Sequence, residues 1–310
     1  MAQADRIRIS VGVLAHNEER LIGRVVAAYL AQETQLAQIT EVIVVSCGST
    51  DATDSVVKQA AVAEPRIQLV SRPQREGKVG AIRVLAELAD GEILLIGGGD
   101  VIPESTAVEH LVAPFARDPR CGMTGARVCP APADGRIAVR LSRVLWQMHH
   151  EMATKAPKLG EVIAVRAVHV HRELPSNVHC DEVLLEALVS RDQARLRYVP
   201  SARVINFPPI TVGELFQQRR RIACQHLAAR RCLRYRPSSS RIGLLCAVLR
   251  DSILSRPRDL PVIVALSAIE AAARAMGCID YAKGERYRTW SPANRPDMAV
   301  STVAEPRSAC

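Results

Sequence analysis

The stretch Leu94-Leu95-Ile96-Gly97-Gly98-Gly99-Asp100-Val101-Ile102-Pro103 runs from apolar residues into three glycines and one carboxylate. An apolar run without polar alternation predicts a strand buried on both faces, as in a parallel sheet covered by helices. Ligands of such sheets bind beyond the carboxyl ends of the strands, and glycines let a ligand approach the backbone closely. We therefore expect Asp100 to be the first charged group that a ligand meets at this edge.

Segments with strand and helix patterns alternate before this stretch. Strands are predicted at residues 6–14, 41–45 and 67–70, and helices at 21–30, 52–63 and 77–88. A helix at 105–115 and a strand at 123–128 continue the alternation. Such alternation indicates right-handed βαβ units. The predicted fold class is therefore α/β, with a mostly parallel central sheet flanked by helices.

The pattern changes after the proline-rich residues 130–135. Helices are predicted at 139–152, 181–188 and 214–235, with strands at 160–166 and 197–204. Two apolar runs, 242–249 and 260–269, are too short to span a membrane, and residues 290–310 resemble a frayed tail.

Composition bounds the class of protein. The 310 residues are 48% hydrophobic and 24% charged, which is typical of a globular chain. The first residues lack the pattern of a signal sequence, so a cytoplasmic location is expected. Nine cysteines without a C-x-x-C pair argue against a disulfide framework or a zinc ribbon.

The positive charge is concentrated in one segment. Residues 217–258 hold eleven arginines against one acid, Asp251, a local charge of +10 that leaves about −1 for the rest of a chain with net charge +9. Arginine beside apolar helix faces suits an anionic membrane surface, and it equally suits phosphate binding within a site. Nucleic acid is disfavoured because ten aromatic residues offer few stacking platforms. A solvated helix face is the remaining alternative.

Six motifs occur in the same order as in the inverting family-2 glycosyltransferases, and residues 9–226 resemble that family. Its fold is the nucleotide-diphosphosugar transferase fold called GT-A. The motifs are Val13–Glu19 (similar to P-A-Y-N-E-E), Val44–Asp51 (V-V-D-D-G-S-T-D), Gly77-Lys78 with Ala81 (G-K-x-x-A), Gly98-Gly99-Asp100 (D-x-D), Asp181-Glu182 (the E-D or D-D general base) and Gln218–Ile222 (Q-x-x-R-W).

The resemblance implies transfer of a sugar, with inversion, from a nucleotide diphosphosugar to a hydroxyl acceptor, with a UDP-sugar the first choice of donor and Mg²⁺ or Mn²⁺ as cofactor. It assigns the metal to Asp100 and the base to Asp181 or Glu182. It also implies a catalytic domain at 1–236, with a donor half at 1–130 and an acceptor half at 131–236, and a helical membrane-surface extension at 237–310. The donor-binding residues that it implies are Ala15, Asn17, Glu18, Cys47, Gly48, Ser49, Lys78, Gly98, Gly99, Gln218, Arg219 and Arg221.

The chain departs from the family at two carboxylate positions. Ser46 and Cys47 replace the two aspartates that hold the uracil ring in the family, and Gly98 replaces the first aspartate of D-x-D, which holds the metal. Asp100, with phosphate oxygens and water, still offers the hard ligands that Mg²⁺ and Mn²⁺ take. The alternative role for Asp100 is to cap the turn before Pro103.

Two further positions carry chemistry. Lys78 follows a glycine at a predicted helix start, where N–H groups favour phosphate, although neither G-x-G-x-x-G nor a complete P-loop pattern is present. Only one of the adjacent Asp181 and Glu182 can point into a cleft and accept the acceptor's proton. Asp181 is the first choice, and Glu182 is the alternative register. The purely structural alternatives are that Lys78 is an exposed helix residue and that Asp181 and Glu182 only cap a helix.

The histidines allow another interpretation. His169, His171 and His179 could form a zinc site, but their spacing matches no standard one. His149 and His150 close the helix of Trp146, on either the acceptor side or a polar surface.

We expect an enzyme rather than a catalytically impaired scaffold of the same fold, because Lys78, Asp100, Asp181 and Arg221 are kept together.

Overall fold

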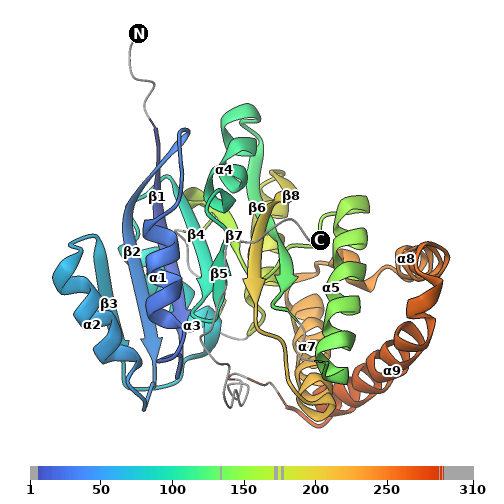
Figure 1. Cartoon of the computed structure of the whole chain (residues 1–310). Coiled ribbons are helices and arrows are strands. Elements are labelled where there is room, and N and C mark those ends of the chain that lie inside the picture. The colour runs from blue at the N-terminus through green and yellow to red at the C-terminus, as the bar shows by residue number, and fades with distance from the viewer. Residues whose placement is uncertain are drawn as a thin grey trace.

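A computed structural model describes residues 6–132, 135–170, 174–175, 178–285, 287 and 289. The predicted tail and His171 lie outside the described residues. Figure 1 shows a curled central sheet with helices on both faces, and a separate group of helices beyond its last strands.

The described residues form one eight-stranded sheet in the order β3-β2-β1-β4-β7-β6-β8-β5. Its strands are β1 (Ile7–Ala15), β2 (Ala37–Cys47), β3 (Ile67–Arg72), β4 (Ile93–Gly98), β5 (Val101–Pro103), β6 (Cys121–Pro130), β7 (Ile163–Arg166) and β8 (Arg195–Asn206).

The amino-terminal half of the sheet is parallel, as predicted. β1 pairs in parallel with both β2 and β4, and β2 pairs in parallel with β3. The sheet then becomes mixed, because β7 is antiparallel to β4 and to β6. The short strand β5 was not predicted. It follows Asp100 directly and is antiparallel to β8.

Helices cover both faces of the parallel half because its strands bury both sets of side chains. In β2, Val42 and Val44 pack into one apolar core, and Ile43 and Val45 pack into the other. The helices are α1 (Ile22–Leu30), α2 (Thr53–Ala63), α3 (Gly77–Leu88), α4 (Ala107–Arg117), α5 (Ile137–Lys155), α6 (Asp181–Arg191), α7 (Val212–Leu233), α8 (Ile242–Ser255) and α9 (Leu260–Ala282).

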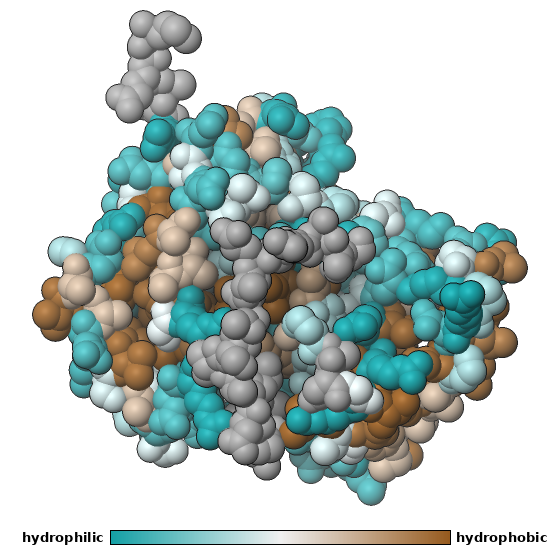
Figure 2. Space-filling model, viewed as in Figure 1, coloured by the Kyte–Doolittle hydropathy of each residue, from teal (hydrophilic) through white to brown (hydrophobic). Residues whose placement is uncertain are grey.

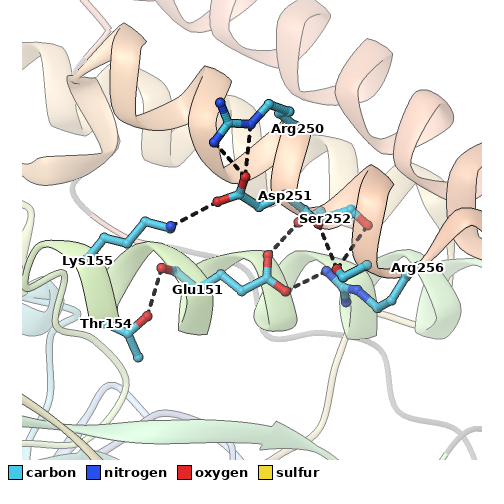
Figure 3. Close-up of polar contacts among 8 residues, drawn as sticks. Glu151, Thr154, Lys155, Arg250, Asp251, Ser252 and Arg256 are labelled. Atoms are coloured by element: carbon cyan, nitrogen blue, oxygen red, sulfur yellow. Dashed lines mark hydrogen bonds and ion pairs between the residues drawn. The ribbon is translucent and has the colours of Figure 1, made fainter.

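Polar side chains of α8 face α5. Glu151 accepts hydrogen bonds from Ser252 (2.5 Å) and Arg256 (2.8 Å), and Lys155 Nζ lies 2.9 Å from the carboxylate of Asp251 (Figure 3). Val248 of α8 is buried, and Leu249 and Ile253 pack against the cluster that α5 and α9 share. Two apolar side chains of α8 are nevertheless largely exposed, Ile242 by 76% and Leu254 by 73%.

Helix α9 packs against α5 and α7. Val262, Ile263 and Leu266 share an apolar cluster with residues of those helices. Glu270 of α9 pairs with Arg219 of α7, and Asp280 pairs with Arg220 (2.6 Å). Arg256 also pairs with Glu151 of α5. Three of the eleven clustered arginines, Arg219, Arg220 and Arg256, therefore bind acids of neighbouring helices.

The expectation that the carboxyl-terminal apolar runs are too short to span a membrane is wrong for the second run. Among the described residues, the helical stretch Pro257–Ala282 is long and apolar enough to cross a membrane by length and composition alone. The sequence pattern did not reveal the full length of this run, because it continues past residue 269 through small residues that Glu270 and Arg274 interrupt. Only 28% of its most apolar window is buried within the protein.

Candidate active site

The carboxyl ends of β1, β2 and β4 meet at one edge of the sheet, where most of the predicted donor residues lie. Gly99 N donates to Leu14 O (2.8 Å), which joins the glycine run to the end of β1. A Cβ added to Gly99 would lie 3.3 Å from Ala15 Cβ and 3.2 Å from Glu18 Cγ. A side chain here would therefore need its neighbours to shift by a few tenths of an ångström, whereas glycine allows the close approach.

The loops after β1 and β2 hold each other through Asn17 and Ser49. Thr50 N donates to Asn17 Oδ1 (2.8 Å), and Asn17 N donates to Ser49 Oγ (3.1 Å). Asn17 adopts a left-handed conformation with φ 56°, which asparagine tolerates better than most residues. Asn17 thus positions the loop after β2 as well as standing at the edge of the site.

The two positions that lost aspartate in this loop are buried. Ser46 is 1% exposed and donates to Ser49 Oγ (2.9 Å). Burial raises the pKa of the Cys47 thiol, so it stays neutral. A narrow pocket opens beside them, lined by Leu14, Ala15, His16, Val45, Cys47, Arg75, Gly77, Lys78 and Ala81.

Gly48 allows Arg75 to lie over the loop after β2. Its φ is +63°, and a Cβ there would lie 2.7 Å from Arg75 Cγ. Burial lowers the pKa of Arg75. Arginine therefore stands in the part of this pocket where the family places carboxylates.

The Asp100 carboxylate turns back over the glycine run. A Cβ added to Gly98 would lie 2.5 Å from Asp100 Oδ1, closer than real contacts allow. A side chain at the position of the first D-x-D aspartate would therefore require the Asp100 carboxylate to turn aside.

Lys78 lies at the centre of the site, in the first turn of α3. Its Nζ is 3.4 Å from Asp181 Oδ2, and its side chain is 30% exposed. Burial alone would lower the pKa of Lys78, but attraction by Asp181, Glu182, Glu161 and Asp100 outweighs it and raises the pKa. The ammonium is therefore permanently charged, and the alternative of an exposed helix lysine is wrong.

Asp181 and Glu182 begin α6 and both interact with Lys78, and Glu182 also interacts with Lys158. Burial and repulsion by Glu182 raise the pKa of Asp181 to about 6, against the attraction of Lys78. Burial would also raise the pKa of Glu182, but Lys78 and Lys158 outweigh it and lower the pKa to about 2. Asp181 is therefore the more basic carboxylate of the pair.

Arg221 of α7 approaches the same carboxylates. Burial lowers its pKa, while Asp181, Glu182 and Glu161 oppose that shift. Its buried Nε has no hydrogen-bond partner among the described residues. Gln218, three residues earlier on α7, shares its face. Arg219, by contrast, is held by Glu270 of α9.

Sequence reasoning missed Glu161 and Lys158. Burial raises the pKa of Glu161 to about 7, with Lys78 opposing and Asp100 adding to the rise. Lys158 is 8% exposed and interacts with Glu186 and Glu182. The available signal was a charged residue on either side of Gly160, immediately before a buried strand. His149 and His226, whose pKa values burial lowers to about 3, also line this side as neutral rings near Lys158.

Three possible metal ligands cluster at the start of α6. Ligand atoms of Cys180, Asp181 and Glu182 lie within 4.8 Å of one another. Burial and the two carboxylates raise the pKa of the Cys180 thiol, and zinc binds only the deprotonated thiolate. His169 lies elsewhere, with Nδ1 2.6 Å from the carboxylate of Asp192.

A family model described as "Glycosyl transferase family 2" matches residues 10–168, half of the chain. The chain belongs to glycosyl transferase family 2. Curated relatives include the prophage bactoprenol glucosyl transferase homolog of Escherichia coli (strain K12) and the bactoprenol glucosyl transferase of Shigella phage SfV. Each is 23% identical over 155 residues, 50% of this chain and 49% of the relative. The chain therefore spans about half the length of the curated relatives it matches.

Solved structures share the GT-A fold. The mannosyltransferase PcManGT from Pyrobaculum calidifontis, solved with GDP-Man and Mn²⁺, aligns with TM-score 0.59 at 23% identity, covering 91% of this chain and 81% of that one. The glucosyl-3-phosphoglycerate synthase from Mycobacterium tuberculosis, solved with Mn²⁺, UDP and phosphoglyceric acid, aligns with TM-score 0.51 at 22% identity, covering 72% and 78%. The predicted family, fold class and enzyme class are confirmed.

Proposed function

We propose that this glycosyltransferase moves a sugar from a nucleotide diphosphosugar to a hydroxyl acceptor by a single displacement with inversion. The observation that carries the proposal is the 3.4 Å approach of Lys78 Nζ to Asp181 Oδ2, beside Asp100 and Arg221. A cation for the leaving diphosphate and a carboxylate for the acceptor's proton thus stand side by side.

The proposed reaction uses these residues in distinct roles. Asp181 accepts the proton of the acceptor hydroxyl while its oxygen bonds to the anomeric carbon and the bond to the diphosphate breaks. Lys78 and Arg221 stabilise the charge that accumulates on the leaving diphosphate. Inversion follows because the acceptor attacks from the face opposite the leaving group.

The donor set fits a divalent cation, because the Asp100 carboxylate offers hard oxygens beside the glycine run. Asp100 would hold Mg²⁺ or Mn²⁺, which when bound neutralises diphosphate charge. The neighbours solved with Mn²⁺ support this assignment. The names of the curated relatives support a glucosyl donor and bactoprenol as candidates for the sugar and the acceptor.

Because Ser46 and Cys47 cannot pair with a base as aspartates do, donor binding is tested across bases. Thermal unfolding is measured with UDP-, GDP- and other nucleotide sugars, with and without Mn²⁺, since a ligand of the folded state raises the midpoint. Transfer is then assayed with each donor that binds. Metal-dependent binding with transfer supports the enzyme, binding without transfer supports the scaffold alternative, and no binding overturns the donor assignment.

We further propose that the enzyme works on an anionic membrane surface, from the cytoplasmic side. The outward apolar residues Ile242, Leu254 and Val264 support this interpretation, with Val264 60% exposed. Figure 2 shows hydrophobic surface at the lower right, where Figure 1 draws α9. The exposed arginines Arg241 and Arg258 flank these side chains and suit anionic headgroups.

A further inference from the structure

The strand β7 runs antiparallel to β4 and brings its leading residues against the glycine run. Ile163 pairs with Ile96, and Ala164 pairs with Leu95. Glu161 lies two residues before the first paired residue of β7, at the end of β4 that leads into the glycine run. The close approach continues beyond the paired residues, because a Cβ added to Gly97 would lie 3.3 Å from Val162 Cγ2.

The chain is held in a tight turn at Glu161. Val162 N donates to Gly160 O (2.8 Å), and Ala126 N donates to Val162 O (3.0 Å). Glu161 itself has φ 59°, a conformation that costs energy for a residue with a side chain. Strand pairing on both sides therefore fixes where this side chain leaves the backbone.

The Glu161 carboxylate interacts with Lys78, Asp100, Glu182 and Asp181. Arg221 also lies within electrostatic reach. Glu161, which precedes β7, and Asp100, which follows β4, therefore lie within electrostatic reach of each other.

Position 98 is a glycine and supplies no carboxylate of its own, and Asp100 Oδ1 lies 2.5 Å from where a Cβ would stand there. The neighbouring strand can supply one from Glu161, which precedes the residues of β7 paired with β4 and interacts with Asp100. A hard cation binds better with two protein carboxylates than with one, since each adds charge and an oxygen ligand.

We propose that Glu161 supplies the second carboxylate of the cation site, from β7 across the sheet, in place of the aspartate that residue 98 lacks. Glu161 and Asp100 then hold Mg²⁺ or Mn²⁺ between them when the nucleoside diphosphate binds. This inference rests on the proposed function, because it assigns a residue to the cation site of the donor complex.

The test is Mn²⁺ binding to the full chain, measured from the electron paramagnetic resonance signal of free Mn²⁺ at fixed UDP or GDP. Glu161→Gln keeps size and removes charge, Asp100→Asn is the reference loss, and Glu87→Gln on the exposed side of α3 is the matched control. We expect Glu161→Gln to weaken Mn²⁺ binding by roughly tenfold or more, the scale for altered groups around a metal. Glu87→Gln leaves it unchanged.

Thermal unfolding without metal separates a binding role from a structural one. Glu161→Gln removes a repelling charge, so its midpoint is expected to equal or exceed that of the wild type. Glu161→Gly, which also suits the left-handed φ, must lose Mn²⁺ binding while remaining folded. Wild-type Mn²⁺ affinity in both folded variants overturns the inference alone. A wild-type protein that binds neither nucleotide nor Mn²⁺ overturns the proposed function with it.

Discussion

Lys78 Nζ and Asp181 Oδ2, 3.4 Å apart, join the first turn of α3 to the first turn of α6. The two residues are 103 positions apart in the sequence, yet each lies where a helix amino terminus points at the same edge of the sheet. The lysine favours phosphate and the ionised form of the carboxylate together. This pair therefore links the donor half of the site to its acceptor half.

Removal of the proposed base should depress turnover without loss of donor binding. We expect Asp181→Asn to lower kcat by roughly 10²–10⁴-fold, the usual effect of a positioned base, with donor affinity nearly unchanged. Glu182→Gln is the matched control, because Glu182 is the alternative candidate for the base. Steady-state transfer assays and donor titrations measure both. If Glu182→Gln abolishes turnover and Asp181→Asn does not, the base is Glu182.

The pH profile of transfer should report the same carboxylate. Burial and Glu182 raise the pKa of Asp181 to about 6, and a base works only when deprotonated. The value of kcat/KM should therefore be flat above about pH 7 and fall about tenfold per pH unit well below pH 6. Because the two acids are coupled, this apparent pKa belongs to the pair. If the remaining activity of Asp181→Asn still falls below pH 6 as that of the wild type does, Asp181 is not the group that causes the fall.

Loss of the central cation should destabilise the folded protein. Lys78→Met leaves Asp181 and its neighbouring carboxylates uncompensated, at a cost of about 3 kcal/mol, the lower end of the range for a broken buried pair because Lys78 is 30% exposed. Urea unfolding measures the change. The double variant Lys78→Met/Asp181→Asn should recover part of it. Equal stability of Lys78→Met and the wild type would show that the pair contributes nothing to folding.

Membrane binding should depend on the outward apolar side chains of α8 and α9. We expect Leu254→Gln with Val264→Gln to reduce co-sedimentation with anionic vesicles, and added salt to reduce it further, because exposed charges are screened over about 10 Å at 0.1 M. Val62→Gln on α2, 89% exposed, is the matched apolar control. Truncation is unsuitable because Val262, Ile263 and Leu266 are buried against α5 and α7. Equal vesicle binding by the double variant and the Val62→Gln control would contradict the proposal.

The sequence by itself determined the parallel half of the sheet and its motifs. Apolar runs such as that of β4 can be stable only with helices on both faces, and the glycines that follow mark where a ligand meets the backbone. The edge that joins Asn17 and Asp100 follows from strand alternation alone. Lys78 and Asp181 were likewise identifiable, since charged residues at helix starts form local patterns.

Only the tertiary structure decided which contacts form between segments that are distant in the sequence. The antiparallel entry of β7, which sets Ile163 opposite Ile96 and Glu161 near the glycine run, depends on strand pairing between residues that share no local signal. Ion pairs of Arg219 and Arg220 with α9 made part of the basic segment a helix interface rather than free charge. Glu151 and Lys155 of α5 bind Ser252 and Asp251, so the inward side of α8 carries polar as well as apolar residues, while Ile242 and Leu254 are exposed. Periodicity shows that a helix has two faces, but only the groups packed against it decide which one is buried.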